Sequence, residues 1–165
     1  MIDSIIQSQR LYIDNAYEEV ASKFCNLAGS NTTKTAERFL LSNWYEGYIY
    51  TALLAMKKEL ERVPFQNRGD KTPYWSPSYI KQYKFLIIKL FEINGVLNEL
   101  GLQKYEQIIN NESNTGEEFV KHKLGIIKNM LDSYSNAGLN YLKEKYDNDP
   151  DLFDHHQSLK EIMLK

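Results

Sequence analysis

The sequence predicts an all-α protein, a mostly antiparallel bundle of four to five long helices with a short C-terminal helix. Apolar residues recur at alternating spacings of four and three, which keeps one side of an α-helix apolar. The stretches with this spacing are Ile49–Val63, Tyr79–Leu100 and Val120–Tyr141. No segment shows the alternation of apolar and polar residues that is typical of a half-buried strand.

The composition is that of a globular protein with one domain, predicted to cover residues 1–165. The chain is 42% hydrophobic and 25% charged, and its net charge of -2 gives no global field that favours nucleic acid or an anionic membrane. Its single cysteine, Cys25, cannot form an internal disulfide, and residues 1–10 lack the pattern of a signal peptide. These features indicate a cytoplasmic protein, and its use of Asn, Lys and Ile indicates an AT-rich bacterial or phage genome.

The first two predicted helices cover residues 3–27 and 33–63. Apolar side chains recur every seven residues along the first one, at Ile6, Ile13, Val20 and Leu27. The second helix ends before Pro64, because proline lacks the N–H group and its ring clashes with the preceding turn. Gly47 lies inside the second helix, where a missing side chain allows a neighbouring helix or ring to approach closely.

An irregular loop is predicted at about residues 64–76, where turn-forming residues gather and no apolar period is present. Ser76 and Pro77 begin the third predicted helix, because serine caps a helix and proline fits its first turn. This helix runs to Leu100, and residues 103–109 form a short fourth one.

The fifth predicted helix begins at residues 116–118 and ends at Tyr146. Its acidic first turn suits the positive end of the helix dipole. Gly138 is the weak member of its apolar series and indicates a close helix crossing. A turn at residues 147–150 precedes the short C-terminal helix, predicted within residues 151–164.

A basic and aromatic stretch gives one candidate binding surface. Between Lys57 and Lys89, eight basic residues stand against three acidic ones, and aromatic residues interleave with them. Basic side chains neutralise phosphates while exposed rings stack on bases, so the stretch is a candidate for binding nucleic acid or a protein partner. In the alternative interpretation, the charges are solvated and the rings cap the bundle. The candidate residues are Lys57, Lys58, Arg62, Arg68, Lys71, Tyr74, Trp75, Lys81 and Lys84.

Glu46 is the one candidate acid for catalysis. It lies in the densest aromatic cluster, residues 43–50, where desolvation would raise the pKa of a carboxyl group and make it a general acid or base. The simpler interpretation is a carboxylate that faces solvent or accepts hydrogen bonds from tyrosine hydroxyls.

The sequence contains no motif for a metal site, a phosphate-binding loop or a catalytic cysteine. His155 and His156 are adjacent, which points their imidazoles in different directions on a helix, and His122 is isolated. No phosphate-binding glycine loop is present, and Cys25 reads as a small buried hydrophobe. We therefore assign no catalytic residue, no metal site and no cofactor.

These observations favour a non-catalytic helical adaptor or a small subunit of a bacterial or phage protein assembly. Its partner would be another protein or a second copy of the chain, because coiled-coil interfaces share the apolar spacing of a bundle core. One alternative is a nucleic-acid-contacting subunit of a ribonucleoprotein, defence or anti-defence complex that uses residues 57–84. Another is an enzyme without a recognisable motif. No membrane or small-molecule partner is predicted.

Overall fold

The computed structural model describes residues 1–27, 40–67, 73–110 and 116–165, and every regular element in these ranges is helical. The predicted all-α class is confirmed. Only three of the helices exceed ten residues, so the described chain does not clearly form four to five long helices. The three are α4 (Trp44–Lys57), α5 (Ile80–Phe91) and α8 (Glu117–Asn148).

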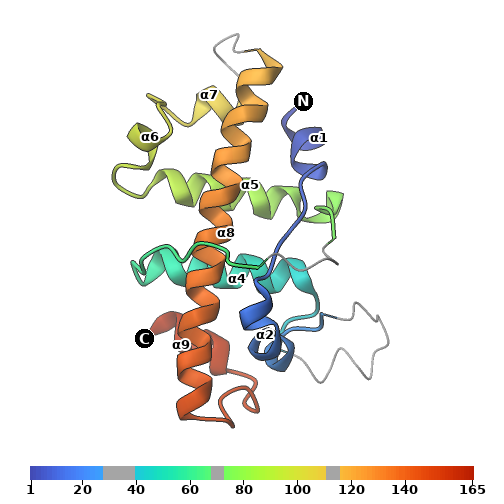
Figure 1. Ribbon diagram of the computed structural model, residues 1–165, viewed down its shortest axis with the longest axis vertical. Coiled ribbons are helices and arrows are strands. Elements are labelled where there is room, and N and C mark those ends of the chain that lie inside the picture. The colour runs from blue at the N-terminus through green and yellow to red at the C-terminus, as the bar shows by residue number, and fades with distance from the viewer. Residues whose placement is uncertain (28–39, 68–72, 111–115) are drawn as a thin grey trace.

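The three long helices form a crossed arrangement. Helices α4 and α5 lie side by side and run in the same direction, while α8 crosses both of them steeply (Figure 1). The long helices therefore depart from the predicted mostly antiparallel arrangement. In the described part of the chain, no helix is long and apolar enough to cross a membrane.

The crossing of α4 and α8 is the closest contact between helices in the core. Gly138 of α8 lies directly on the backbone of Thr51 in α4, and a Cβ atom added at Gly138 would lie 2.1 Å from the Thr51 carbonyl oxygen. The Thr51 hydroxyl lies 2.8 Å from that of Ser135. The close crossing that Gly138 predicts is therefore confirmed. Gly47 likewise makes room, because its added Cβ would lie 2.8 Å from the Cys25 sulfur.

The prediction of one continuous helix over residues 3–27 is wrong. The structure has α1 (Ile2–Gln7), a 3-10 turn η1 (Asn15–Tyr17) and α2 (Glu18–Phe24) instead. Between α1 and η1 the backbone pairs with a distant segment, since Leu11 N donates to the Pro73 oxygen at 3.0 Å. Asp14 then starts a new turn by accepting a hydrogen bond from Ala16 N at 3.0 Å. The residues with the seven-residue spacing are buried or half-buried on both sides of the break, so the spacing reports burial and not one continuous helix.

Helix α4 is shorter than predicted within the described residues, while residues 33–39 of that prediction lie outside them. Asn43 caps its start by accepting hydrogen bonds from Tyr45 N and Glu46 N. Its end is set by Glu59, which adopts a left-handed φ of 54° and lets Leu60 N donate to the Ala55 oxygen at 3.0 Å. This reversal ends the helix several residues before Pro64.

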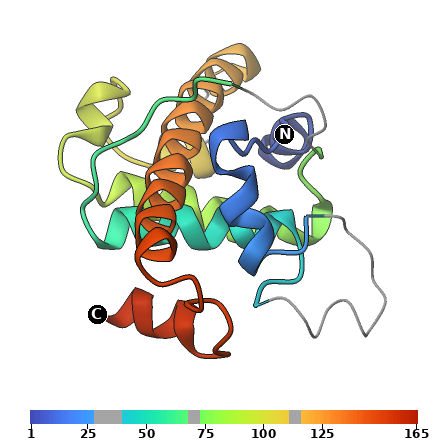
Figure 2. The same cartoon turned by 60° about the horizontal axis from the view of Figure 1, so that its bottom comes forward.

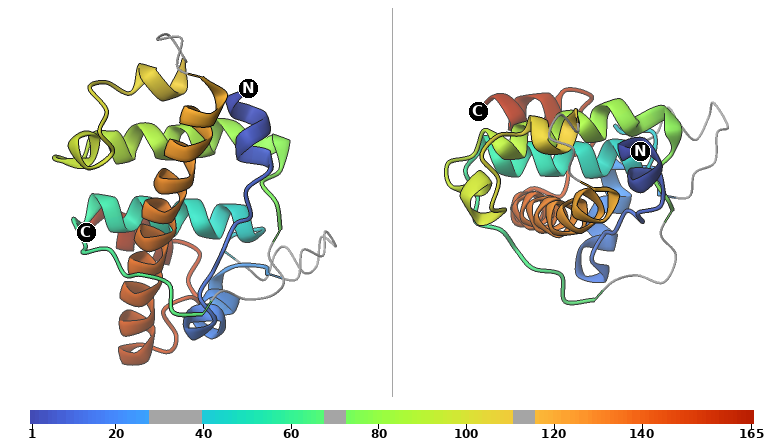
Figure 3. Two further views of the ribbon diagram at one scale, coloured as in Figure 1. Left: turned by 45° about the horizontal axis from the view of Figure 1, so that its top comes forward. Right: turned by 90° about the horizontal axis from the view of Figure 1, so that it is seen from above.

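Residues 60–67, which we call the strap, cross α8 in an extended conformation (Figure 2). Val63 N donates to the Ser133 oxygen at 3.1 Å, and the Asn136 amide nitrogen lies 3.3 Å from the Val63 oxygen. Gln66 N donates to the buried Asp14 carboxylate at 2.8 Å. Viewed from above, the strap and α4 lie on opposite sides of α8 (Figure 3).

The third predicted helix is divided as well. Ser76 caps a 3-10 turn, η2 (Pro77–Tyr79), which leads into α5, as the sequence predicts. The helix ends at Phe91 because the chain reverses through Gly95, whose φ is 87°, before α6 (Val96–Glu99). Helix α7 (Glu106–Ile109) lies inside the predicted short fourth helix.

The C-terminal part follows the prediction most closely. Helix α8 has 32 residues and ends two residues beyond the predicted Tyr146. The short C-terminal helix is α9 (Ser158–Leu164), which lies against α4 because the Tyr50 hydroxyl donates to the Leu159 oxygen at 2.6 Å.

Candidate functional site

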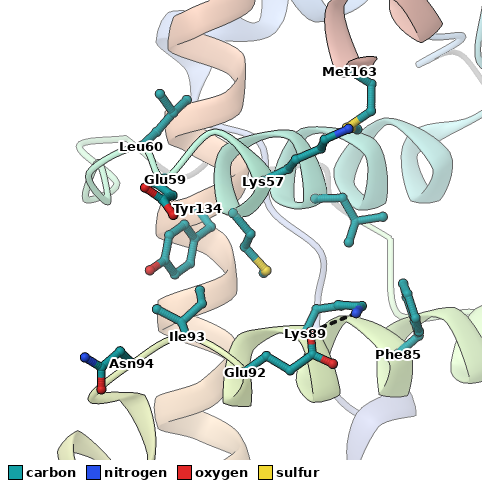
Figure 4. A pocket seen from close by; sticks show the side chains of 12 residues that line it. Lys57, Glu59, Leu60, Phe85, Lys89, Glu92, Ile93, Asn94, Tyr134 and Met163 are labelled. Carbon is teal, nitrogen blue, oxygen red and sulfur yellow. Dashed lines mark hydrogen bonds and ion pairs between the residues drawn. The ribbon is translucent and has the colours of Figure 1, made fainter. Parts of the chain in front are cut away.

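An open apolar groove of ≈ 900 Å³ lies between the C-terminal halves of α4 and α5 (Figure 4). Leu53 and Met56 come from α4, and Ile93 follows α5. Tyr134 of α8 and Met163 of α9 complete the lining, so four helices position the groove. We call it the apolar groove.

Several apolar side chains of this groove keep part of their surface in contact with water. Phe85 is 46% exposed, and Leu53, Met56 and Ile93 are half-buried. The last three belong to the four-three spacing that predicts the bundle core. The fold therefore buries most of that spacing but leaves its members at this end partly exposed.

Charged residues of both signs surround the apolar groove. Lys89 and Glu92 form an ion pair at 2.7 Å, while Lys57 and Glu59 stand at the end of α4. Glu59 is the residue with the left-handed backbone, a conformation that costs energy for any residue except glycine. The groove thus combines an apolar floor with a rim that carries no net charge.

The candidate basic residues near the end of α4 have different local roles. Lys57 lies on the rim of the apolar groove, and the Lys58 amine lies 5.4 Å from the centre of the Tyr141 ring. Arg62, on the strap, forms an ion pair with Glu99 of α6 at 3.0 Å. Arg68 and Lys71 lie outside the described residues.

The other candidate residues of the stretch lie at the beginning of α5, at the opposite end of the helix pair. Tyr74 is 52% exposed, whereas Trp75 is 2% exposed and packs among Tyr45, Tyr48 and Tyr83. Lys81 is exposed, and Lys84 pairs with Asp3 at 2.5 Å. The structure does not bring the described residues of 57–84 together in one surface. Helices α4 and α5 are parallel, so the residues at the end of α4 lie at the opposite end of the helix pair from those at the beginning of α5.

Glu46 takes part in capping α4. Its carboxylate accepts a hydrogen bond from Ser42 N at 2.7 Å, and the Tyr79 hydroxyl lies 3.4 Å from its other oxygen. The side chain is half-buried. This geometry matches the simpler interpretation of a carboxylate that accepts hydrogen bonds at a helix start.

Several groups in the core have strongly raised pKa values. Burial raises the pKa of the Cys25 thiol to about 12, so the thiol stays protonated and unreactive at neutral pH. Burial, with Asp132 as the second cause, raises the pKa of Tyr48 well above its ordinary value. The Tyr48 hydroxyl donates to the buried Asp132 carboxylate at 2.7 Å, and Lys128 pairs with the same carboxylate.

Tyr48, Asp132 and Lys128 form a hydrogen-bonded group that links α4 to α8. Asp132 is 2% exposed and lies beside a hollow of ≈ 410 Å³ between the strap and α8. Among the described residues, no three His, Cys, Asp or Glu side chains gather in a way that could hold a metal ion. The enzyme alternative stays a prediction.

Sequence reasoning allowed the four-three spacing to serve a protein interface, but it did not locate the part of the spacing that stays exposed. The available signal was the spacing itself, which does not distinguish a covered face from an uncovered one. Phe85 and Met163 carried no signal, because neither belongs to that spacing. Among the described candidate residues of the basic and aromatic stretch, Lys57 alone lines the apolar groove.

Comparison with known proteins adds no family. No protein-family model, curated protein or solved structure matches the chain.

Proposed function

We propose that the protein is a non-catalytic helical adaptor, a small subunit of a bacterial or phage protein assembly, that binds an amphipathic helix of another protein in the apolar groove. The observation that carries the proposal is the partial exposure of Leu53, Met56 and Ile93 around an open groove of ≈ 900 Å³. A partner's apolar face would remove these side chains from water, which is the main driving force of association. An amphipathic helix in an apolar groove is a recurrent form of recognition.

The rim of the groove supports a helix with charges of both signs as the occupant. Lys57, Glu59, Lys89 and Glu92 can pair with such charges on either side of the partner's apolar face. Glu59 adds support because non-glycine residues with a costly backbone conformation gather at binding sites. The proposal includes a cytoplasmic setting, in agreement with a chain that has one cysteine.

A photo-crosslinking amino acid at the position of Phe85 tests this proposal in cells of the native source. Tyr105 gives the matched control position, because it is 42% exposed and lies away from the apolar groove. We expect a discrete cross-linked protein from position 85 only, with the attachment point in a helical segment. The same products from both positions, or none from position 85, would contradict the proposal.

The identified segment, made as a peptide, then provides a binding measurement. Phe85→Glu should weaken binding by about tenfold or more, because it places a charge on the apolar floor. The variant should fold normally, since the new carboxylate lies four residues before Lys89 on α5. Tyr105→Glu should leave binding unchanged.

A second copy of the chain is the other protein partner that the sequence predicts. Light scattering across a wide range of concentrations separates this case from the first. A dimer that Phe85→Glu dissociates would place a second copy in the groove, whereas a monomer leaves the groove for another protein.

A further inference from the structure

We propose that a second groove, formed by the N-terminal segment and the first half of α8, binds single-stranded nucleic acid. This groove, which we call the basic groove, has a volume of ≈ 690 Å³ and is separate from the apolar groove. Its lining includes the basic residues Arg10, Lys121, His122 and Lys128, and no acidic residue of the described chain lines it. The inference concerns a site different from the one proposed for a protein partner.

The charge of the basic groove comes from two parts of the chain. Lys121 and His122 are exposed on α8, and Arg10 faces them from the segment after α1. Asp132 pairs with Lys128, and Arg10 and Lys121 bring two further positive charges to the groove. Two or more cations around one groove attract the phosphates of a nucleic-acid strand.

An exposed ring stands beside these cations. Tyr74 is 52% exposed, and the Arg10 guanidinium carbon lies 4.4 Å from the centre of its ring. The Arg10 side chain also donates to the Tyr74 hydroxyl at 3.1 Å, which fixes the ring at the edge of the groove. A base that stacks on Tyr74 would keep its phosphate near Arg10, which is the combination that single-strand binding sites use.

The walls of the basic groove are held in place before any ligand binds. Gln9 donates to the Leu124 oxygen at 3.2 Å and accepts a hydrogen bond from Tyr83 at 3.0 Å, so it fastens the N-terminal segment to α8. Gly125 leaves open space on the α8 side of the groove, because no atom lies within 4 Å of the position that its Cβ would occupy. A preformed site loses less conformational freedom on binding.

Single-stranded nucleic acid is favoured over an acidic peptide because of Tyr74. Phosphates and carboxylates would both be attracted by Arg10 and Lys121, but only nucleic acid brings a base for the exposed ring to stack on. The sequence predicts nucleic-acid contact through residues 57–84. Of the described residues of that set, the basic groove takes only Tyr74, and it adds residues from the N-terminal segment and from the first half of α8.

Fluorescence anisotropy with labelled oligo(dT) and oligo(rU) tests the proposal. We expect binding that weakens as salt is added, and the ribose and deoxyribose probes tell RNA from DNA. Arg10→Glu combined with Lys121→Glu should weaken binding by about tenfold or more and reduce the slope of log affinity against log salt by about 1.4, the loss of two phosphate contacts. The single change Lys121→Glu, at an exposed position, should give part of this effect.

Matched variants distinguish binding in the basic groove from attraction by the overall charge of the protein. Lys23→Glu with Lys160→Glu makes the same change of net charge at exposed positions elsewhere and should alter affinity by less than about twofold. Tyr74→Ala should weaken binding by about fivefold or more, while Tyr74→Phe keeps the stacking and should stay near wild type. Phe85→Glu should have no effect, because Phe85 lies in the apolar groove.

Three results would overturn the proposal. The first is absence of oligonucleotide binding by the wild-type chain at low salt. The second is an equal loss of affinity in the two double variants, which would leave only non-specific attraction. The third is equal or tighter binding of polyglutamate, or of vesicles that contain phosphatidylserine, because the groove would then recognise an acidic peptide or a membrane surface.

Discussion

Two glycines of α8 have opposite surroundings, and they divide this helix into two regions. A Cβ atom added at Gly138 would lie 2.1 Å from the Thr51 carbonyl oxygen, whereas one added at Gly125 would meet no atom within 4 Å. The C-terminal region is a wall of the core, crossed by α4 on one side and by the strap on the other. The N-terminal region is a wall of the basic groove. A continuous helix can thus provide both a tight crossing and an open surface.

The largest expected effect comes from a substitution in the buried region of α8. Asp132→Ala should lower the free energy of unfolding by about 3–5 kcal/mol, because it leaves Lys128 and the Tyr48 hydroxyl without their common acceptor. Urea denaturation measures the change. A variant that combines Asp132→Leu, Lys128→Met and Tyr48→Phe should recover most of the loss, since apolar side chains replace the whole group. A loss below about 1 kcal/mol from Asp132→Ala would show that this network is not part of the stable core.

The next largest effect is expected at the crossing of α4 and α8. Gly138→Ala should destabilise the protein by about 3 kcal/mol, because the new methyl group meets backbone atoms of Thr51, and α4 and α8 must separate. Thermal and urea denaturation give the measurement. If the variant were as stable as the wild type, the two helices would not cross as closely as the structure places them.

A smaller effect depends on pH. Burial raises the pKa of Tyr48, so the folded protein favours the protonated phenol; its contribution is fully present below pH 10 and is lost as the pH rises above that value. Each such tyrosine contributes a slope of about 1.4 kcal/mol per pH unit. Tyr48→Phe should cost about 2 kcal/mol at neutral pH, through the lost bond to Asp132, and this difference should narrow above pH 10.

Urea denaturation of both proteins from neutral to alkaline pH checks this prediction. Tyr83 also has a raised pKa from burial, so the variant should keep part of the alkaline loss. Parallel curves for the two proteins would contradict a buried, protonated Tyr48.

The smallest effect has the opposite sign and sharpens the comparison. Gly125→Ala should raise the free energy of unfolding by about 0.5–1 kcal/mol, because alanine favours the helix and its methyl group enters open space. The same substitution thus stabilises one region of α8 and destabilises the other. Two destabilised variants would show that Gly125 is as crowded as Gly138.

The parts of the fold that sequence reasoning predicted well depend on local signals. The acidic first turn and unbroken spacing of α8 placed its ends within two residues, and Ser76 was correctly assigned as a cap. The break before α2 could not be predicted in this way, because the backbone around Leu11 bonds to Pro73, far along the chain. The early end of α4 depends on Glu59 in a conformation that the sequence pattern associates with glycine.

The candidate sites were harder to predict for the same reason. The described residues of a stretch that is continuous in sequence, residues 57–84, are divided between the two ends of a helix pair. The basic groove is assembled from Arg10, Tyr74 and Lys121, which are widely separated in sequence. Composition finds charges that are neighbours along the chain, whereas a groove depends on which elements the fold places side by side.

The position of the strap has a consequence for the order in which the molecule can assemble. α8 lies between α4 and the strap (Figure 3), held by Thr51 against Gly138 on one side and by Val63 bonded to Ser133 on the other. During synthesis the ribosome releases α4 and the strap before α8 exists. Helix α4 and the strap therefore cannot complete their packing until α8 has been synthesised. The last third of the chain then completes the fold through contacts distant in sequence.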